Sequence, residues 1–434
     1  MSPATRALTL LLCCLLSLSA RATAAPVRFG IDVLQDDGFK QLTGKRIGLV
    51  ANPAAVDAKL RATSDVLAAA EAVKLVSLFG PEHGIYGNVY AGDTVDDATD
   101  PRTGRKLYSL YGKTSRPTAE MVSDIDAIVF DLQDIGSRSY TYIATMKRVM
   151  ESCAEFDKEL IILDRANPLG GERIEGPGLV EGFESGVSSL PVPYVHGMTM
   201  GELAQFTREK FFPGFKKLTI IPMRGWKREM VWSETGHDWV PTSPHVPTAR
   251  SAAAYAATGI LGELYVVSIG VGYTLPFEMV GSPTIDGEAL AEAMPKQEGI
   301  IFRPVHFRPF YGTFAGEACQ GVQVHIDPKT AKSLVEVNYR LLQYLGAKKL
   351  FAAGDAKAQK QAEDAADARA KKSGKARATR PVKFDARTRM FDKVSGSDEP
   401  RKWLESGKPL DELFAKWRKE CEAFRKEREK FLLY

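Results

Sequence analysis

Four apolar stretches in the first half of the sequence end in residues of the kinds that enzymes use for acid–base chemistry. The clearest lies within residues 74–88, where an apolar run stops at Gly80 and Pro81 and is followed at once by Glu82 and His83. A carboxyl group and an imidazole can transfer protons, while amide and Arg side chains can hold a polar substrate. The four stretches provide the candidate residues Asn52, Glu82, His83, Asp131, Gln133, Asp134, Asp164, Arg165 and Asn167.

The alternative is that each of these residues only caps the helix that follows its strand. Capping accounts for one side-chain oxygen per turn, whereas these turns carry several charged or amide groups each. We therefore predict a polar site at the ends of the strands.

The elements that must position these residues alternate between strand and helix. Apolar strands are predicted at residues 46–52, 74–79, 126–131, 160–164 and 218–222, and helices at 63–72, 140–153 and 199–211. Repeated strand–helix units with fully apolar strands are typical of a parallel sheet covered on both faces. Because the carboxyl ends of parallel strands share one edge, the candidate side chains should converge on one cleft. Residues 25–226 are therefore predicted to form a Rossmann-like, mostly parallel α/β domain.

The second half of the sequence predicts a smaller α/β (α+β) domain over residues 227–434. Strands are predicted at 264–269, 300–308 and 321–326, followed by a helix at 331–345 and an amphipathic helix opened by Pro409. Residues 352–380 consist almost wholly of small and charged residues, which cannot bury a core. This stretch is predicted to be a mobile insertion, with an exposed helix as the alternative.

The amino-terminal residues predict export. Arg6 precedes an apolar run at residues 8–16, and a small-residue cleavage site follows at residues 22–24, so residues 1–24 are predicted to be a signal peptide. The expected location is periplasmic or secreted, with no membrane anchor after cleavage. The remaining cysteines are Cys153, Cys319 and Cys421, which are expected to be buried thiols, with one disulfide as the alternative.

Several function classes find no support in the sequence. The net charge of +4 favours neither nucleic acid nor an anionic membrane as a partner. No Gly-x-Gly-x-x-Gly follows the first strand and there is no P-loop, so no nucleotide cofactor is expected. The six histidines lack the spacing of metal ligands, so no metal is expected either.

Motifs in order along nearly the whole chain resemble those of the NamZ-type exo-β-N-acetylmuramidases of bacteria. Members of that family are described as a Rossmann-like domain joined to a smaller α/β domain, with the site in the cleft between them. The stretches that carry the resemblance are GPEHG at 80–84 with Ala91, Gly92 and Asp93, SLYGKTSRPT at 109–118, FDLQDIGSRSYTYI at 130–143, LDRANPLGG at 163–171, EGP at 175–177, HGMTMGEL at 196–203, PFEMVGSP at 276–283 and the terminal FLLY.

The resemblance implies a glycoside hydrolase that removes terminal N-acetylmuramic acid from peptidoglycan fragments, with Glu82 as the catalytic acid. The second group would be Asp131, Asp134 or Asp164, or the acetamido group of the sugar itself. Arg138 and Arg165 are candidates for the lactyl carboxylate of the substrate, because an Arg fork binds carboxylates bidentately. Further substrate contacts are expected from Asn52, His83, Gln133, Asp134, Tyr140, Asn167, His196 and Glu263.

One segment departs from the family pattern. Members usually carry a stretch resembling E-G-T-N-x-S-E-G-R-G before the PFE motif, whereas residues 263–272 here read ELYVVSIGVG. Ile269 and Val271 thus replace an acidic residue and an arginine. The loss of this charge pair keeps a second hypothesis open, in which the same cleft binds a wall-derived sugar without cleaving it.

Overall fold

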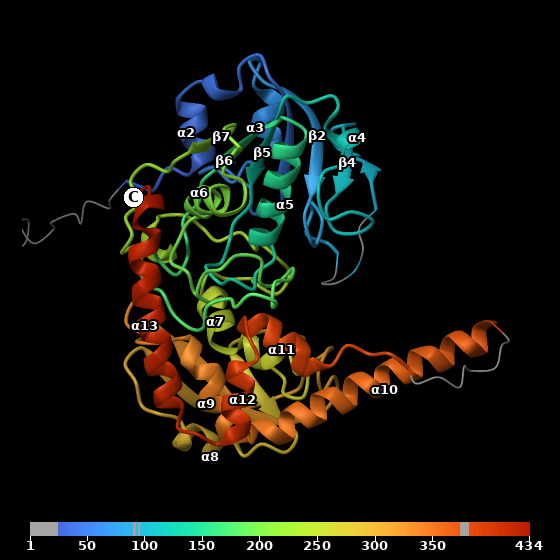
Figure 1. The fold of residues 1–434 in the computed structure, drawn as a ribbon, viewed down its shortest axis with the longest axis vertical. Helices are drawn as coiled ribbons and strands as arrows, with labels where there is room; N and C mark the ends of the chain where they lie inside the picture. The colour runs from blue at the N-terminus through green and yellow to red at the C-terminus, as the bar shows by residue number, and fades with distance from the viewer. Residues whose placement is uncertain (1–24, 90–92, 94–95, 374–381) are drawn as a thin grey trace, which may run out of the picture.

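The computed structural model describes residues 25–89, 93, 96–373 and 382–434. The predicted signal peptide at residues 1–24, residues 91 and 92 of the family motif, and residues 374–380 of the low-complexity stretch lie outside this part of the chain. The described residues form two lobes, one above the other in Figure 1. The first lobe carries a seven-stranded sheet and the second a three-stranded sheet.

The seven-stranded sheet has the order β3-β4-β2-β1-β5-β6-β7. Every neighbouring pair is parallel except β3 and β4, which pair antiparallel at one edge. This arrangement confirms the predicted Rossmann-like α/β class. The strands are β1 (Arg46–Ala51), β2 (Lys74–Gly80), β3 (Ala98–Thr99), β4 (Lys106–Ser109), β5 (Ala127–Asp131), β6 (Glu159–Leu163) and β7 (Leu218–Ile221), of which β3 and β4 were not predicted.

Side chains alternate across this sheet and build a core on each face. In β5, Ile128 and Phe130 pack with the helices α5 (Tyr142–Glu155) and α6 (Met200–Phe211), whereas Ala127 and Val129 pack with α2 (Gly30–Asp36) and α3 (Thr63–Ala69). A strand buried on both faces reads as a continuous apolar run, which is why β1, β2, β5 and β6 could be predicted. The short helix α4 (Ala119–Val122) precedes β5.

The second lobe is built on an antiparallel sheet of order β8-β10-β9, formed by β8 (Met279–Ser282), β9 (Ile300–Phe307) and β10 (Cys319–Ile326). The prediction of a strand at 264–269 is wrong, since only Ser268 forms a bridge there, with Gly281. Tyr265 has a positive φ of 55°, which breaks an extended run. Helices α7 (Arg250–Gly262), α8 (Gly287–Ala293) and α9 (Val335–Leu345) complete this lobe.

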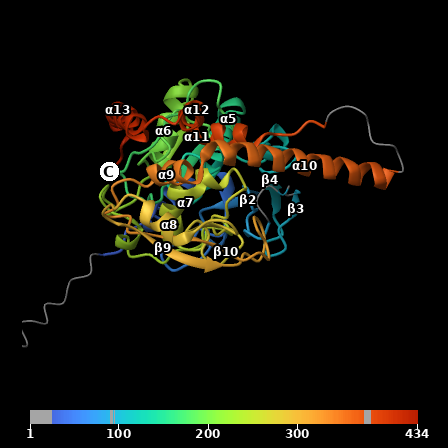
Figure 2. The same cartoon turned by 90° about the horizontal axis from the view of Figure 1, so that it is seen from below.

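The low-complexity stretch is helical. Its described part, residues 352–373, lies in α10 (Ala347–Ser373), which projects from the second lobe in Figures 1 and 2. Only the start of α10 is packed: Phe351 is buried and contacts Phe391 of α11 (Arg387–Ser395), with ring centroids 5.0 Å apart. The described part of the stretch thus forms the exposed helix that was the alternative to a mobile insertion. A further helix, α12 (Glu399–Ser406), leads to the last long helix.

The helix α13 (Leu410–Arg428) runs along both lobes in Figure 1. Its predicted apolar stripe is buried: Trp417 packs on Tyr339 of α9 in the second lobe, and Phe424 packs on Phe206 of α6 in the first. Beyond it, the hydroxyl of Tyr434 donates a 2.7 Å hydrogen bond to Asp164 at the end of β6. Short 3₁₀ turns occur at Lys40–Leu42, Trp232–Glu234 and Glu429–Phe431.

Cys153, Cys319 and Cys421 are free and buried, as predicted. Within the described residues, no helix combines the length and the apolar character needed to cross a bilayer.

Candidate active site

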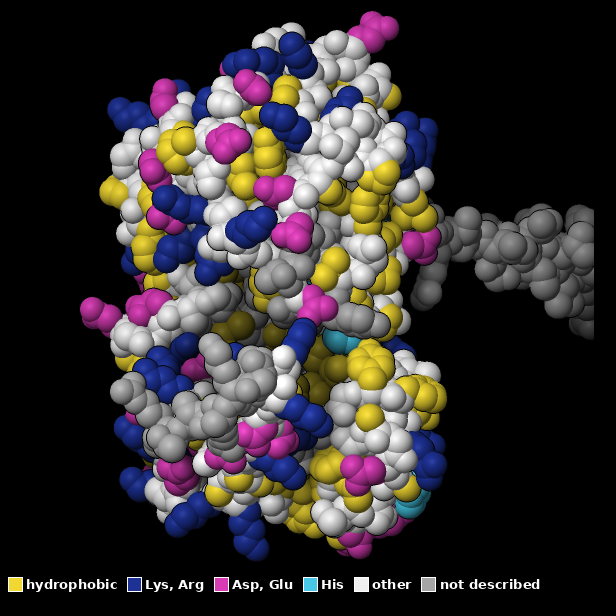
Figure 3. Space-filling model, turned by 90° about the vertical axis from the view of Figure 1, so that its right-hand side faces the viewer, with side chains coloured by type: hydrophobic (Ala, Val, Ile, Leu, Met, Phe, Trp, Pro, Cys, Tyr) yellow, Lys and Arg dark blue, Asp and Glu magenta, His cyan; other side chains and the backbone are white. Residues whose placement is uncertain are grey.

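A cavity of about 290 Å³ lies where the first lobe faces the second. Its first wall comes from the loops that follow β2 and β5, the two neighbours of β1, where the strand order reverses. Open α/β sheets bind ligands at this kind of reversal. Its other wall comes from residues 243–246, the end of α7 and residues 263–271. The cavity opens into the hollow between the lobes in Figure 3, where hydrophobic side chains lie inside and charged and histidine side chains lie at the edge.

Glu82 is held in this cavity by a tight turn and by the opposite loop. The turn closes with a 2.9 Å hydrogen bond from Gly84 N to the Pro81 carbonyl oxygen, and the hydroxyl of Thr141 donates to Glu82 Oε2 at 2.7 Å. A Cβ at position 80 would come within 2.9 Å of Ile85 N, so the close approach requires glycine. Tyr111 lies beside the same carboxylate, and its burial together with the Glu82 charge raises the pKa of Tyr111 to about 12.

Backbone strain gathers around the cavity. Among the described residues, seven non-glycine residues have a positive φ, and three of them line it: His83 (71°), Tyr265 (55°) and Phe277 (68°). Each such conformation costs free energy and persists only where the surrounding structure enforces it, which is most common at ligand sites. The His83 ring is fixed as well, with Nδ1 2.9 Å from the carbonyl oxygen of Val89.

Aromatic side chains form much of the wall. Tyr140 meets Tyr142 edge-on, with ring centroids 4.8 Å apart, and Tyr255 meets Phe277 in the same way at 5.0 Å. Burial raises the pKa of Tyr255, and the charges of Glu263 and Glu82 raise it further, while the Tyr255 hydroxyl lies 3.0 Å from the Ser139 hydroxyl. Apolar walls with a few fixed polar groups are typical of small-molecule sites.

Glu263, directly after α7, supplies a second carboxyl group to the cavity. Burial raises the pKa of Glu263 to about 7, against a smaller opposing effect of the Arg387 charge. Near neutral pH a fraction of this carboxyl is therefore protonated and can donate a proton or a hydrogen bond. Glu82 and Glu263 thus present two carboxyl groups from opposite lobes to the same space.

Four of the predicted site residues line the cavity: Glu82, His83, Tyr140 and Glu263. Asp131 and Asp164, predicted as catalytic alternatives, are absent from its lining and are fully buried. Asp131 pairs with Arg165 and accepts from the Thr63 hydroxyl at 2.6 Å. The carboxylates of Asp131 and Asp164 thus bind other groups of the protein and are not available to a substrate in the cavity.

The contacts of Asp164 show the same internal role. It accepts hydrogen bonds from the Thr199 hydroxyl, Gly201 N and the Tyr434 hydroxyl, and burial raises its pKa to about 6. This network joins the end of β6 to α6 and to the end of α13.

The two arginines predicted to bind the substrate carboxylate do not line the cavity either. Arg138 is 1 % exposed, and its guanidinium donates to the carbonyl oxygens of Pro177, Val192 and Val394. Arg165 is 3 % exposed and binds Asp131, with Nη2 2.9 Å from Oδ2. Their guanidinium groups are already occupied, so we assign both a positioning role.

The remaining predicted residues brace the loops behind the cavity wall. The Asn52 amide donates to the Tyr142 hydroxyl at 3.1 Å and to the Thr242 carbonyl oxygen at 2.8 Å. Four more predicted residues are buried outside the lining and form hydrogen bonds with neighbouring backbone groups: Gln133, Asp134, Asn167 and His196. The His196 ring also lies 3.5 Å from the Asp134 carboxylate. Most of the amides and carboxylates at the strand ends therefore stabilise the loops behind the cavity and do not face the cavity themselves.

Sequence reasoning missed much of the lining. Ser139, Thr141 and Tyr142 follow β5 within the motif quoted at residues 130–143, so their position could have been noticed. His245, Tyr255, Tyr265 and Phe277 come from a long interdomain loop, from α7 and from the segment after it. No sequence spacing links these four to Glu82, because only the packing of the second lobe brings them there.

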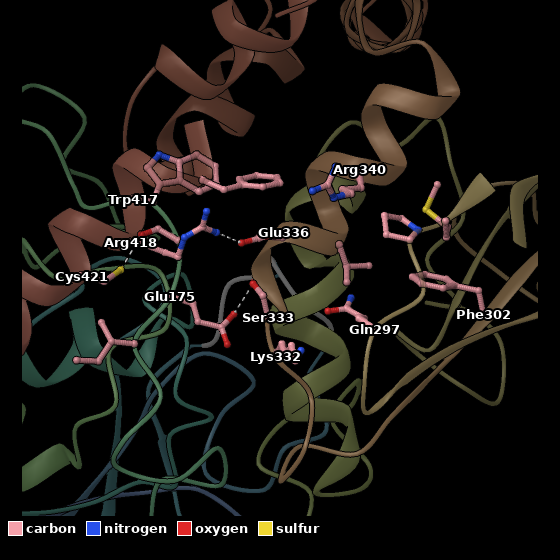
Figure 4. A pocket seen from close by; sticks show the side chains of 16 residues that line it. Glu175, Gln297, Phe302, Lys332, Ser333, Glu336, Arg340, Trp417, Arg418 and Cys421 are labelled. Atoms are coloured by element: carbon pink, nitrogen blue, oxygen red, sulfur yellow. Dashed lines mark hydrogen bonds and ion pairs between the residues drawn. The ribbon is translucent and has the colours of Figure 1, made fainter. Parts of the chain in front are cut away.

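A larger cavity, of about 500 Å³, lies between residues 174–176, α9 and α13. In Figure 4, Glu336 and Arg418 point toward each other across it, with a 3.0 Å ion pair, and Glu175 points toward Ser333. Glu175 Oε2 also accepts from Leu334 N at the start of α9. These charges stabilise the junction of the helices, and none of the candidate residues lines this cavity, so the smaller cavity is the better site.

Groups of three or more His, Cys, Asp or Glu residues that could hold a metal ion do not occur in the part of the chain that the structure describes.

Comparisons with known proteins cover almost the whole chain. Residues 47–250 match the family model for the N-terminal part of the exo-β-N-acetylmuramidase NamZ, and residues 253–434 match the model for its C-terminal part. The chain is 36% identical over 421 residues to the peptidoglycan β-N-acetylmuramidase NamZ of Bacillus subtilis (strain 168), covering 96% of this chain and 94% of the relative.

Two crystal structures of DUF1343 family proteins from Bacteroides fragilis NCTC 9343 are similar in fold. The first has a TM-score of 0.80 at 42% identity, and the second a TM-score of 0.68 at 27% identity. Each comparison covers 94% of this chain and 99% of the other.

Proposed function

Because the chain belongs to the NamZ exo-β-N-acetylmuramidase family, we propose that it is a glycoside hydrolase that releases terminal N-acetylmuramic acid from peptidoglycan fragments. The observation that carries the proposal is the placement of Glu82, a fixed carboxyl group in an aromatic-walled cavity between the lobes. Family membership supports the class of reaction, and the cavity supports the assignment of its residues.

The size of the cavity supports action on a chain end. Pockets for small molecules measure roughly 300–1,000 Å³, and this cavity, at about 290 Å³, lies at the lower limit of that range. It therefore accommodates one terminal sugar more readily than a length of glycan. An enzyme that encloses a single residue in this way removes it from an end.

In the proposed mechanism Glu82 protonates the oxygen of the leaving sugar. Thr141 holds the Glu82 carboxyl in place through its 2.7 Å hydrogen bond, so the acid is oriented before the substrate arrives. Cleavage also needs a group on the opposite side of the anomeric carbon. Glu263 and the substrate's own 2-acetamido oxygen are the two candidates, and Glu263 replaces the predicted Asp131 and Asp164 because it lines the cavity.

We further propose that the protein works in the periplasm or outside the cell. The support is the predicted signal peptide at residues 1–24, since peptidoglycan fragments arise outside the cytoplasmic membrane. Fractionation of cells that express the full chain tests this step, and full-length protein retained in the cytoplasm would contradict it.

The direct test of the activity is hydrolysis of a chromogenic N-acetylmuramic acid β-glycoside by the purified protein. Release of the chromophore and of free N-acetylmuramic acid, together with release of one sugar at a time from a defined glycan fragment, is the expected result. Binding of the sugar without turnover would instead favour the hypothesis of a non-catalytic binding protein. Internal cleavage of the fragment would contradict the proposed exo action.

A further inference from the structure

The charged groups that line the cavity are poorly suited to a substrate that carries a carboxylate. The ionisable side chains of its described lining are Glu82, Glu263, His83, His245 and tyrosines, and no Lys or Arg is among them. Burial, and to a smaller extent His83, lowers the pKa of His245, which disfavours the charged form of that ring. The described lining therefore offers two carboxyl groups and no Lys or Arg, while N-acetylmuramic acid has a carboxylate on its lactyl group. Recognition of that group requires a cation near the cavity.

Arg387, the first residue of α11, provides such a cation at the cavity mouth. Its guanidinium carbon lies 4.1 Å from the centroid of the Tyr265 ring. Tyr265 lines the cavity and is 45% exposed, so this ring forms part of the entrance. The Arg387 charge also reaches inside, because it lowers the pKa of Glu263 against the effect of burial.

The Arg387 guanidinium is fixed in position but is available to a ligand. Stacking on Tyr265 restrains it, and the start of α11 is anchored to α10 through Thr388, whose backbone N and hydroxyl bind Asp355 at 3.0 and 2.9 Å. Over the described residues, the Arg387 side chain forms no ion pair and donates no hydrogen bond. A guanidinium that is oriented yet unpaired loses little side-chain entropy when it binds a carboxylate.

A second cation strengthens the positive charge of this entrance. Lys357 of α10 donates a 2.8 Å hydrogen bond to the carbonyl oxygen of Tyr265. Burial lowers the pKa of Lys357, and the neighbouring Arg387 charge lowers it further, so the two cations lie close together. Inside the entrance the wall is apolar at Ile269 and Val271. Two cations thus lie close to the mouth, whereas the described lining itself contains no Lys or Arg.

We propose that Arg387 binds the lactyl carboxylate of the substrate at the mouth of the cavity and so selects N-acetylmuramic acid over N-acetylglucosamine, the same sugar without the lactyl group. The proposal deepens the proposed function and rests on it for the identity of the substrate. It assigns recognition to the side chain of Arg387 and leaves the acid chemistry to Glu82.

The test compares chromogenic glycosides of the two sugars with three variants. In Arg387→Gln, the KM for the muramic acid glycoside should rise roughly tenfold to a hundredfold, the range expected for a lost charge-assisted hydrogen bond. The kcat and the KM for the glucosamine glycoside should stay close to wild type. Arg387→Lys should restore part of the preference. Arg389→Gln removes the same charge from the same helix at an exposed position and serves as the matched control.

The methyl ester of the muramic acid substrate gives a readout that does not depend on any variant. With the wild-type protein, esterification should raise KM by a factor similar to that of Arg387→Gln, and the two changes together should cost no more than either alone. An Arg387→Gln protein that keeps the wild-type preference, or that loses both substrates equally, would overturn the proposal.

Calorimetry separates failure of this inference from failure of the proposed function. If the wild-type protein hydrolyses neither glycoside, the proposed function fails, and binding of free N-acetylmuramic acid and N-acetylglucosamine decides the role of Arg387. Binding of the acidic sugar that is lost in Arg387→Gln and kept in Arg389→Gln supports it. Equal binding by wild type and Arg387→Gln, or no binding by the wild type, overturns it.

Discussion

The hydroxyl of Thr141 donates a 2.7 Å hydrogen bond to the carboxylate of Glu82, and this contact joins the loop after β2 to the start of α5. The two residues follow β2 and β5, the strands on either side of β1, where the order of the strands in the sheet reverses. The position of Glu82 therefore depends on two loops that the sheet holds side by side. The contributions of Glu82 and Thr141 to turnover can be tested with separate variants.

Glu82→Gln should abolish most of the turnover while the sugar still binds. The amide keeps the size of the side chain but cannot donate a catalytic proton, and general acid catalysis contributes about 10²–10⁴-fold. The measurement is kcat on the muramic acid glycoside together with calorimetric binding of the free sugar. Glu120→Gln, an exposed site on α4, is the control. Unchanged turnover in Glu82→Gln would remove this residue from the mechanism.

Thr141→Val should lower kcat with little change in KM. Valine has nearly the same shape as threonine but leaves the carboxylate without its 2.7 Å donor. The net contribution of an intramolecular hydrogen bond is about 0.5–1.5 kcal/mol, which sets the expected loss in kcat at roughly twofold to tenfold. Steady-state kinetics on the same substrate measure it. A rise in KM alone would show that Thr141 contacts the sugar instead.

Glu263→Gln should flatten the pH dependence of stability. Since the pKa of Glu263 is raised to about 7 in the folded protein, its contribution to stability is complete in acid below the ordinary value of 4.5 and is lost as pH rises through 7. Wild type should therefore lose about 1–3 kcal/mol more than Glu263→Gln between about pH 5 and pH 8.5, a range that allows for partial exposure of the side chain to the cavity. Denaturant melts at the two pH values measure the difference, and parallel curves for the two proteins would contradict the burial of this carboxyl.

Tyr434→Phe should destabilise the protein by about 1–3 kcal/mol, because Asp164 loses one of its buried donors. The loss should be larger above the Asp164 pKa of about 6, where the hydrogen bond serves a charged carboxylate, and smaller in acid. Tyr344→Phe, at a 45% exposed position on α9, is the matched control. Equal melting temperatures for the two variants would show that the contact contributes nothing.

Deletion of residues 362–380 should change the free energy of unfolding by less than about 1 kcal/mol, since the far part of α10 buries little surface. Phe351→Ala, at the packed start of the same helix, should cost about 3–5 kcal/mol. Thermal and denaturant melts of both variants test the contrast. A large loss on deletion would mean that this part of α10 packs against something.

The sheet could be predicted because its central strands are apolar on both faces, as in Ile128 to Phe130 of β5. The same pattern placed Glu82 at a carboxyl end and identified its loop as part of the site. Helix α7 was missed because it is buried almost all round, so Ala252 to Leu261 show no polar face.

The candidate site could be predicted only in part. Asp131 is the last residue of β5 and Glu82 follows β2, yet one binds an internal arginine and the other lines the cavity. Both are carboxylates near the carboxyl end of a parallel strand, and the difference between them depends on which neighbour the tertiary structure brings near. The partner of Asp131 is 34 residues away, and Tyr255 reaches the cavity from the other lobe. Contacts of this kind leave no periodic signal in the sequence.

The bond between Tyr434 and Asp164 spans 270 residues, and it has a consequence for the order in which the chain can fold. Phe431 and Tyr434 follow the second lobe in the sequence, yet they complete the packing around α6 and the end of β6 in the first lobe. The first lobe therefore reaches its final packing only when this segment has docked on it. We expect the two lobes to unfold and refold in a single late transition.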